Sequence, residues 1–190
     1  MQYTDDQLIH RVESNAKGFT SWADVTDGMV DIWVRTAPDT SNVFKDKVYT
    51  YAIVNGAPVF AKVCTGTSKA GTTGLLKPTN PLGCAILKSD QIVYNSHMFG
   101  KHKGEYFAYV QAKPFPFYRD NNKNLEPEEI GQLYNGPAIG ANCHHAGVNS
   151  TYIFNWSEGC LVRNVLVDFY RWMQIMNKRK FLTVCILKEF

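Results

Sequence analysis

The sequence contains no apolar run that approaches the roughly 18 residues needed for a membrane-spanning helix. Its first residues, Met1 to Asp6, are polar and acidic, so they do not supply the apolar segment of a signal peptide. We therefore expect no stable membrane insertion and synthesis in the cytoplasm, unless a leader was removed before Met1.

The chain also lacks a disulfide framework and a strongly basic segment. Its five cysteines are odd in number and scattered, and no Cys-x-x-Cys pair is present, which predicts reduced thiols. The net charge is only +3, and the densest basic segment, 178–180, is typical of a cationic helix end. We therefore expect no nucleic-acid partner.

What the chain does contain is enough apolar sequence for one folded domain. Hydrophobic residues make up 45% of its 190 residues, which suits a single domain over 1–190 with an N-terminal helical extension over 1–28. Alternating apolar patterns predict strands at 30–34, 48–54, 57–64, 105–111, 114–119, 138–144, 152–154 and 181–187, with an Asn-Gly hairpin turn at 55–56. Helical periodicity predicts helices at 4–17 and 163–177, and residues 75–104 are expected to be loops and short strands. The predicted fold class is mainly β, a β-rich α+β protein.

Two segments superficially resemble ligand-binding loops. Gly66 and Gly71 have the spacing of a phosphate-binding loop, but Thr72 stands where that loop requires lysine. Residues 120–126 place oxygen-bearing side chains at alternate positions but lack the glycine and glutamate of a calcium loop. We therefore expect no cofactor at either segment.

One short stretch carries most of the residues capable of chemistry. His144 and His145 lie upstream of Cys160, which follows the segment Trp-Ser-Glu-Gly at 156–159. An imidazole within hydrogen-bond reach is the usual means of converting a thiol into a nucleophilic thiolate. Gly159 permits a sharp turn that can aim N–H groups at the oxyanion of an acyl-transfer intermediate. The same residue types also suit a buried structural cysteine.

The order of these motifs resembles the L,D-transpeptidase catalytic domain, over roughly residues 45–175. The resemblance comprises a hairpin ending in Val-Cys-Thr-Gly-Thr at 63–67, a Gly/Thr loop, a His-x-x-Gly-like element and Ser-x-Gly-Cys before a helix. The chain looks still more like phage and gut-bacterial relatives with a His-x-Ala-Gly element, a Trp-Ser-x-Gly-Cys box and a segment like Gly-Lys-His-Lys-Gly at 100–104. The resemblance implies a β-sandwich with a helix after the cysteine. It also implies a Cys/His pair that acts on peptidoglycan stem peptides, at the cell wall or from a phage particle.

The resemblance implies a role for each matching residue. His144, three residues before Gly147, fits the base, and the carbonyl of His145 would then orient its ring. His145 remains an alternative base, because the family often has glycine directly after its histidine. The implied catalytic set is Cys160, His144, His145, Gly159 for oxyanion-hole backbone, and Ser157 at the motif's Ser/Thr position. The residues expected to contact substrate are Trp156, Tyr152, Asn149, Arg163 and His102.

Three departures from the family pattern leave the reaction open. Glu158 replaces a usual histidine, Val162 occupies the position of a usual arginine, and the spacing from histidine to serine is short. Transfer to an amine, hydrolysis and loss of activity all remain compatible with these departures.

Two other classes of function are also compatible with the sequence. One is a non-catalytic cell-wall-binding or phage structural domain. The other is a zinc-dependent hydrolase, although adjacent strand residues such as His144 and His145 face opposite sides, so we expect no metal site. The residues considered as zinc ligands are Cys143, His144, His145, Cys160, His97 and His102. The catalytic interpretation predicts that Cys160 has a lowered pKa and is alkylated before the other cysteines.

Overall fold

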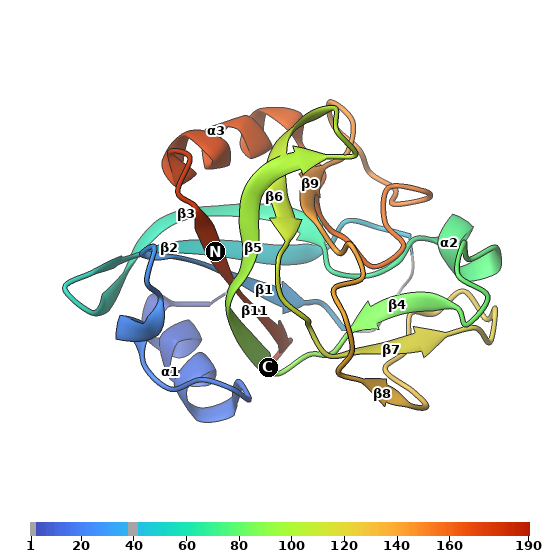
Figure 1. Cartoon of the computed structure of the whole chain (residues 1–190), viewed down its shortest axis with the longest axis horizontal. Helices are drawn as coiled ribbons and strands as arrows, with labels where there is room; N and C mark the ends of the chain where they lie inside the picture. Colours follow the sequence, from blue (N-terminus) through green and yellow to red (C-terminus); the bar gives the residue numbers. More distant parts are fainter. Residues whose placement is uncertain (1–2, 38–41) are drawn as a thin grey trace.

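The computed structural model describes residues 3–37 and 42–190 and shows a mainly β protein (Figure 1). Most of the described strands belong to one sheet, which closes on itself in the order β1-β11-β5-β6-β9-β10-β3-β2. A smaller sheet has the order β4-β7-β8. The predicted mainly β class is confirmed. No helix in the described residues is long and apolar enough to cross a bilayer.

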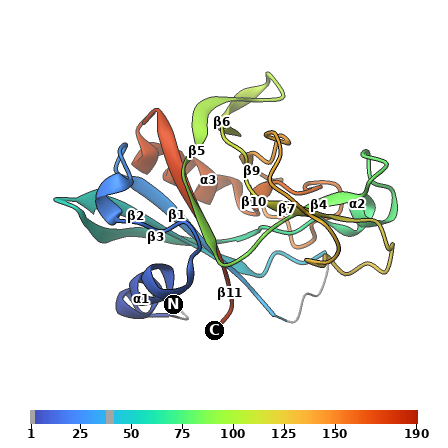
Figure 2. The same cartoon turned by 60° about the horizontal axis from the view of Figure 1, so that its bottom comes forward.

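The elements have the following bounds. The strands are β1 (Met29–Arg35), β2 (Asp46–Val54), β3 (Ala57–Thr67), β4 (Cys84–Leu87), β5 (Gln91–His102), β6 (Tyr106–Gln111), β7 (Phe117–Asp120), β8 (Leu133–Tyr134), β9 (Cys143–His145), β10 (Leu161–Arg163) and β11 (Phe181–Lys188). The helices are α1 (Asp5–Asn15), η1 (Trp22–Asp24), α2 (Thr72–Leu76) and α3 (Leu166–Met176). Helices α1 and α2 lie at opposite ends of the molecule in both views, with the small sheet beside α2 (Figures 1 and 2).

The N-terminal helix forms where the capping signal predicts it. The Thr4 hydroxyl accepts a hydrogen bond from the Gln7 backbone N–H, and the Gln7 side chain accepts one from the Thr4 N–H. Leu8 and Val12 are fully buried in a hydrophobic cluster that also contains residues of β1, β2 and β11. The segment predicted as an extension is therefore packed onto the outside of the main sheet.

The β2–β3 hairpin also forms as predicted. Asn55 and Gly56 both have positive φ, 51° and 77°, as the tight two-residue hairpin turn requires. The predicted strands at 30–34 and 181–187 pair in parallel as β1 and β11.

The structure corrects the prediction for residues 75–104. This segment contains β4 and the twelve-residue strand β5, which pairs with both β11 and β6. Residues 114–119 were expected at a sheet edge, but β7 lies in the middle of the small sheet, between β4 and β8. The pairing partners lie far apart along the chain, so local sequence does not reveal them.

Three further element predictions near the candidate site are also corrected. The strand expected over 138–144 is limited to β9. In the segment 152–154, only Tyr152 makes a strand-like contact, an isolated bridge to Val43. Arg163, predicted as the first residue of a helix, belongs to β10. Helix α3 begins three residues later, at Leu166.

The interior of the main sheet is packed with aromatic side chains and contains one ion pair. Phe169, Trp172 and Met176, on the predicted apolar stripe of α3, are fully buried in this core. Arg163 is fully buried, 2.6 Å from an Asp31 oxygen, with its guanidinium carbon 3.7 Å from the centre of a Trp172 ring.

Candidate active site

Two short parallel strands position the predicted nucleophile and base. The pairing of β9 with β10 puts His144 opposite Val162. Because side chains alternate across a strand, His144, Val162 and the preceding Cys160 share the outer face of this pair. Cys143 and Leu161 point the other way and are fully buried in the interior core.

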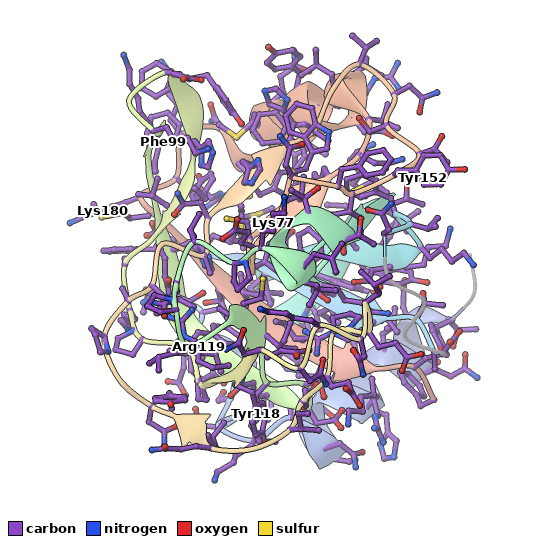
Figure 3. All side chains as sticks on the ribbon, turned by 90° about the vertical axis from the view of Figure 1, so that its right-hand side faces the viewer. Lys77, Phe99, Tyr118, Arg119, Tyr152 and Lys180 are labelled. Carbon is purple, nitrogen blue, oxygen red and sulfur yellow. The ribbon has the colours of Figure 1, made fainter. Side chains whose placement is uncertain are left out.

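The outer face opens into a cavity of about 470 Å³ that Cys160 and His144 both line. A second cavity, of about 230 Å³, meets the first at Thr79, Glu158 and Cys160. Figure 3 looks onto this side of the molecule, where the labelled Arg119 of β7 lines the second cavity. Cys160 therefore stands where two cavities join. The other residues that line the larger cavity are His102, Lys103, Glu105, Tyr106, Asn155 and Trp156.

Cys160 is the only partly exposed cysteine among the five, and the other four are buried. Its thiol donates a hydrogen bond to the Gly140 carbonyl oxygen at 3.5 Å. Burial raises the pKa of the Cys160 thiol, while the backbone N–H of Asn142 and the charge of Lys103 act in the opposite direction. The net pKa is raised, so the lowered pKa expected from the sequence is wrong for the resting protein. The Cys160 side chain is therefore a neutral thiol at neutral pH.

His144 is held as a neutral imidazole with a defined tautomer. Its Nδ1 lies 2.9 Å from the carbonyl oxygen of His145, the orientation that the sequence predicted. A ring nitrogen that bonds to a carbonyl carries the proton, which leaves Nε2 as the acceptor. Burial, together with the neighbouring His102, lowers the pKa of His144 to about 3. The ring is therefore unprotonated at neutral pH.

His102 packs against the ring of His144. The two imidazole rings stack with their centroids 4.1 Å apart and their planes inclined by 20°. The Asn142 side-chain amide donates to Nδ1 of His102 at 3.1 Å, and burial lowers the pKa of His102. Predicted as a substrate contact, His102 lines the cavity and also supports the ring of His144.

The ring of His145 lies on the other side of β9. It packs against Tyr106 and Phe169, with ring centroids 4.3 and 5.0 Å away, and its Nδ1 bonds to the Ala146 carbonyl. His145 does not line the cavity that holds Cys160. Of the two histidines that the sequence left open as base, His144 is the one that lines the cavity of Cys160.

The turn before Cys160 is shaped by Ser157 and Gly159. Gly159 has φ of +127°, and a Cβ there would lie 2.6 Å from the Ala85 carbonyl oxygen, so only glycine fits. The buried Ser157 hydroxyl accepts from the Gly159 N–H at 3.1 Å and donates to the Cys160 carbonyl at 2.9 Å. The Gly159 N–H is thus engaged by Ser157, which contradicts its predicted role as an oxyanion donor. Ser157 positions the turn.

The predicted substrate contacts divide into two groups. Trp156 is 40% exposed and lines the larger cavity. Tyr152, labelled in Figure 3, and Asn149 are exposed but line neither of the two cavities. Arg163 has no exposed surface and is bonded to Asp31, so the prediction that it contacts substrate is wrong.

Sequence reasoning missed two residues that the structure brings to the site. Asn142 bonds through its side chain to His102 and to the Gln111 N–H, and its carbonyl accepts from the Leu161 N–H at 2.9 Å. Strand alternation from His144 could have placed Asn142 on the same face. Lys103 reaches the cavity from the β5–β6 turn, which only the tertiary structure brings near.

Of the residues considered as zinc ligands, only His102, His144 and Cys160 line the same cavity. Cys143 and His97 are buried in the interior, where His97 Nε2 bonds to the Ala141 carbonyl at 2.7 Å. Over residues 3–37 and 42–190, no group of three or more His, Cys, Asp or Glu side chains is placed to hold a metal ion.

No known protein-family model matches the chain, and no curated protein or solved structure is significantly similar to it. The functional inference therefore depends on the geometry of the site and on the sequence motifs.

Proposed function

We propose that this protein is a cysteine-dependent acyl-transfer enzyme that acts on peptidoglycan stem peptides. The observation that carries the proposal is that the cysteine Cys160 and the buried neutral imidazole of His144 line the same cavity. The peptide substrate comes from the resemblance to L,D-transpeptidases. The acceptor is an amine in transpeptidation or water in hydrolysis.

The reaction begins when Nε2 of His144 takes the proton of the Cys160 thiol as the sulfur attacks an amide carbonyl carbon of the stem. The resulting tetrahedral intermediate collapses, the C–N bond breaks, and the leaving amine takes the proton from His144. An amine or water then attacks the thioester carbonyl, and the thiol regains its proton. The His145 carbonyl stabilises the imidazolium that forms in each half-reaction, since it already accepts from Nδ1.

The raised pKa of Cys160 and the lowered pKa of His144 have a consequence for this mechanism. The resting pair is thiol and imidazole, so proton transfer accompanies attack and does not precede it. The Asn142 N–H, which lowers the pKa of the sulfur, is a backbone donor already directed at the reacting group.

One observation favours the second candidate, a non-catalytic wall-binding or phage structural domain on this fold. The Cys160 thiol is bonded to the Gly140 carbonyl, its pKa is raised, and Ser157 occupies the Gly159 N–H. A site that has lost activity would retain the cavity without an activated sulfur.

Intact-protein mass spectrometry after incubation with disaccharide-tetrapeptide fragments tests the proposal. We expect a covalent acyl adduct on Cys160 in the wild-type protein, with release of the leaving amine. The Cys160→Ala variant should keep the fold and form neither adduct nor product. Turnover that persists in Cys160→Ala would refute the mechanism, and fragment binding without adduct or product in the wild type would favour the non-catalytic domain.

A further inference from the structure

A third cavity, of about 680 Å³, lies between α3 and the β5–β6 hairpin. Figure 1 shows this hairpin beside α3, and Phe99 of β5 is labelled in Figure 3. Its size falls within the range of small-molecule sites. We call it the aromatic groove. It is lined by Phe99, Tyr106, Phe107, Phe169, Tyr170, Met173, Gln174, Asn177 and Lys178.

The aromatic groove leaves flat rings exposed to solvent. Phe107 and Tyr170 are each 54% exposed, and Phe107 stacks on Phe99 with a centroid separation of 5.0 Å. Exposed apolar surface gathered in one hollow marks a binding site more often than an isolated exposed side chain does. The occupant must therefore present an apolar face to these rings.

The rim of the groove is polar. Gln174, Asn177 and Lys178 are exposed along one side and offer two amides and an amine. A hydrocarbon chain would make no hydrogen bonds to these groups, which would remain solvated. A pyranose ring has a C–H face that packs on an aromatic ring and hydroxyls that bond to amides, so it suits both surfaces.

The groove and the cavity of Cys160 have one lining residue in common. Tyr106 lines both, its ring packs against His145, and its hydroxyl lies 3.5 Å from Nδ1 of His144. A molecule with a sugar in the aromatic groove and a peptide at Cys160 would pass over Tyr106 between the two sites.

We propose that the aromatic groove binds the glycan strand that carries the stem peptide. The sugars would stack on Phe107 and Tyr170 and bond to the Gln174 and Asn177 amides. That the sugars are those of peptidoglycan rests on the proposed function, whereas saccharide binding rests on the groove itself.

Calorimetric titration of the Cys160→Ala protein with tri-N-acetylchitotriose tests saccharide binding without catalysis. We expect saturable binding, weakened about tenfold or more by Phe107→Ala and by Tyr170→Ala, because each removes one stacking face. Phe154→Ala is the matched control: this ring is 49% exposed and does not line the groove, so affinity should be unchanged. Thermal unfolding of each variant verifies the fold.

Other outcomes separate this inference from the proposed function. Saccharide binding in a protein that never forms a Cys160 adduct would support the groove and refute the acyl transfer. Adduct formation without saccharide binding, or equal binding by all three ring variants, would overturn the groove. So would binding of decanoate in the groove without binding of the saccharide.

Discussion

The two faces of the β9–β10 pair put neighbouring residues into opposite environments. On the inner face, Cys143 and Arg163 are fully buried among aromatic rings, and the one charge is neutralised by Asp31. On the outer face, His144 and Cys160 line a cavity. A single-residue alternation therefore separates side chains that hold the core together from side chains that can meet a substrate.

A comparison of His97 with His144 shows that burial alone does not decide whether a histidine can act as a base. Burial lowers the pKa of His97 to about 4 and that of His144 to about 3. His97 has both ring nitrogens bonded, to the Ser96 hydroxyl at 2.8 Å and to the Ala141 carbonyl. Within the described residues, the hydrogen bonds of His144 involve only Nδ1, and the ring lines a cavity. A lowered pKa marks a candidate base only when a nitrogen remains accessible.

The largest expected effect concerns the outer face. His144→Gln should slow formation of the Cys160 acyl adduct by about a hundred- to ten-thousand-fold, because the thiol loses its base. His145→Gln keeps the backbone carbonyl that orients His144, so its rate should stay within a few-fold of wild type. Rapid-quench mass spectrometry measures both rates. A greater loss in His145→Gln than in His144→Gln would reverse the assignment.

Substitutions on the inner face of the β9–β10 pair should lower the free energy of unfolding. Arg163→Ala leaves the Asp31 carboxylate buried without its cation, which costs about 3–5 kcal/mol of unfolding free energy. Arg171→Ala, on the exposed side of α3, is the matched control and should change stability by less than about 0.5 kcal/mol. Urea denaturation compares the two. Equal midpoints would show that the buried ion pair is not what stabilises this face.

Acid should destabilise the fold through two buried histidines, His97 of β5 and His144 of β9. The folded-state pKa values of His97 and His144, about 4 and about 3, lie below the ordinary value of 6.5, so the unfolded chain binds more protons between these limits. The contribution of each neutral histidine to the unfolding free energy is therefore fully present above pH 6.5. It is lost as the pH decreases, by up to about 1.4 kcal/mol per pH unit for each histidine. Urea titrations between pH 7 and pH 5 measure the slope. His97→Gln should reduce it, and a flat profile in the wild type would contradict the burial of both rings.

A smaller loss of stability is expected from a substitution in the turn before Cys160. Ser157→Ala removes one acceptor and one donor from a buried turn, at a cost of about 1–3 kcal/mol. The exposed Ser14→Ala should be within about 0.5 kcal/mol of wild type. Because Ser157 positions Cys160, adduct formation should slow while the pH at which the rate is half-maximal stays the same. A shift in that pH would mean that the hydroxyl contacts the sulfur.

Local signals predicted several elements correctly. The Thr4–Gln7 capping box begins α1, Asn55-Gly56 closes the β2–β3 hairpin, and three residues of the predicted apolar stripe of α3, Phe169, Trp172 and Met176, are buried. Each depends on residues within about four positions of one another, a range over which backbone geometry alone decides contact. The prediction for residues 75–104 was wrong because β5 forms through its pairing with β11 and β6, which are distant in the sequence.

The candidate site was predicted only in part for the same reason. Strand alternation separates His144 from His145, and the motif before Cys160 contains the turn that Gly159 and Ser157 form. The burial of Arg163 could not be predicted, because its partner Asp31 lies on β1, 132 residues away along the chain.

The sequence by itself determined the mainly β class, the N-terminal helix, the hairpin and the separation of the two adjacent histidines, since all of these follow from periodicity and short-range hydrogen bonding. Only the tertiary structure decided that His102 stacks on His144, that Lys103 and Asn142 influence the sulfur, and that the thiol is stored in its neutral form. Ring stacking, desolvation and the electrostatic effect of a distant charge depend on which segments lie near one another in space. Local sequence patterns do not predict that proximity.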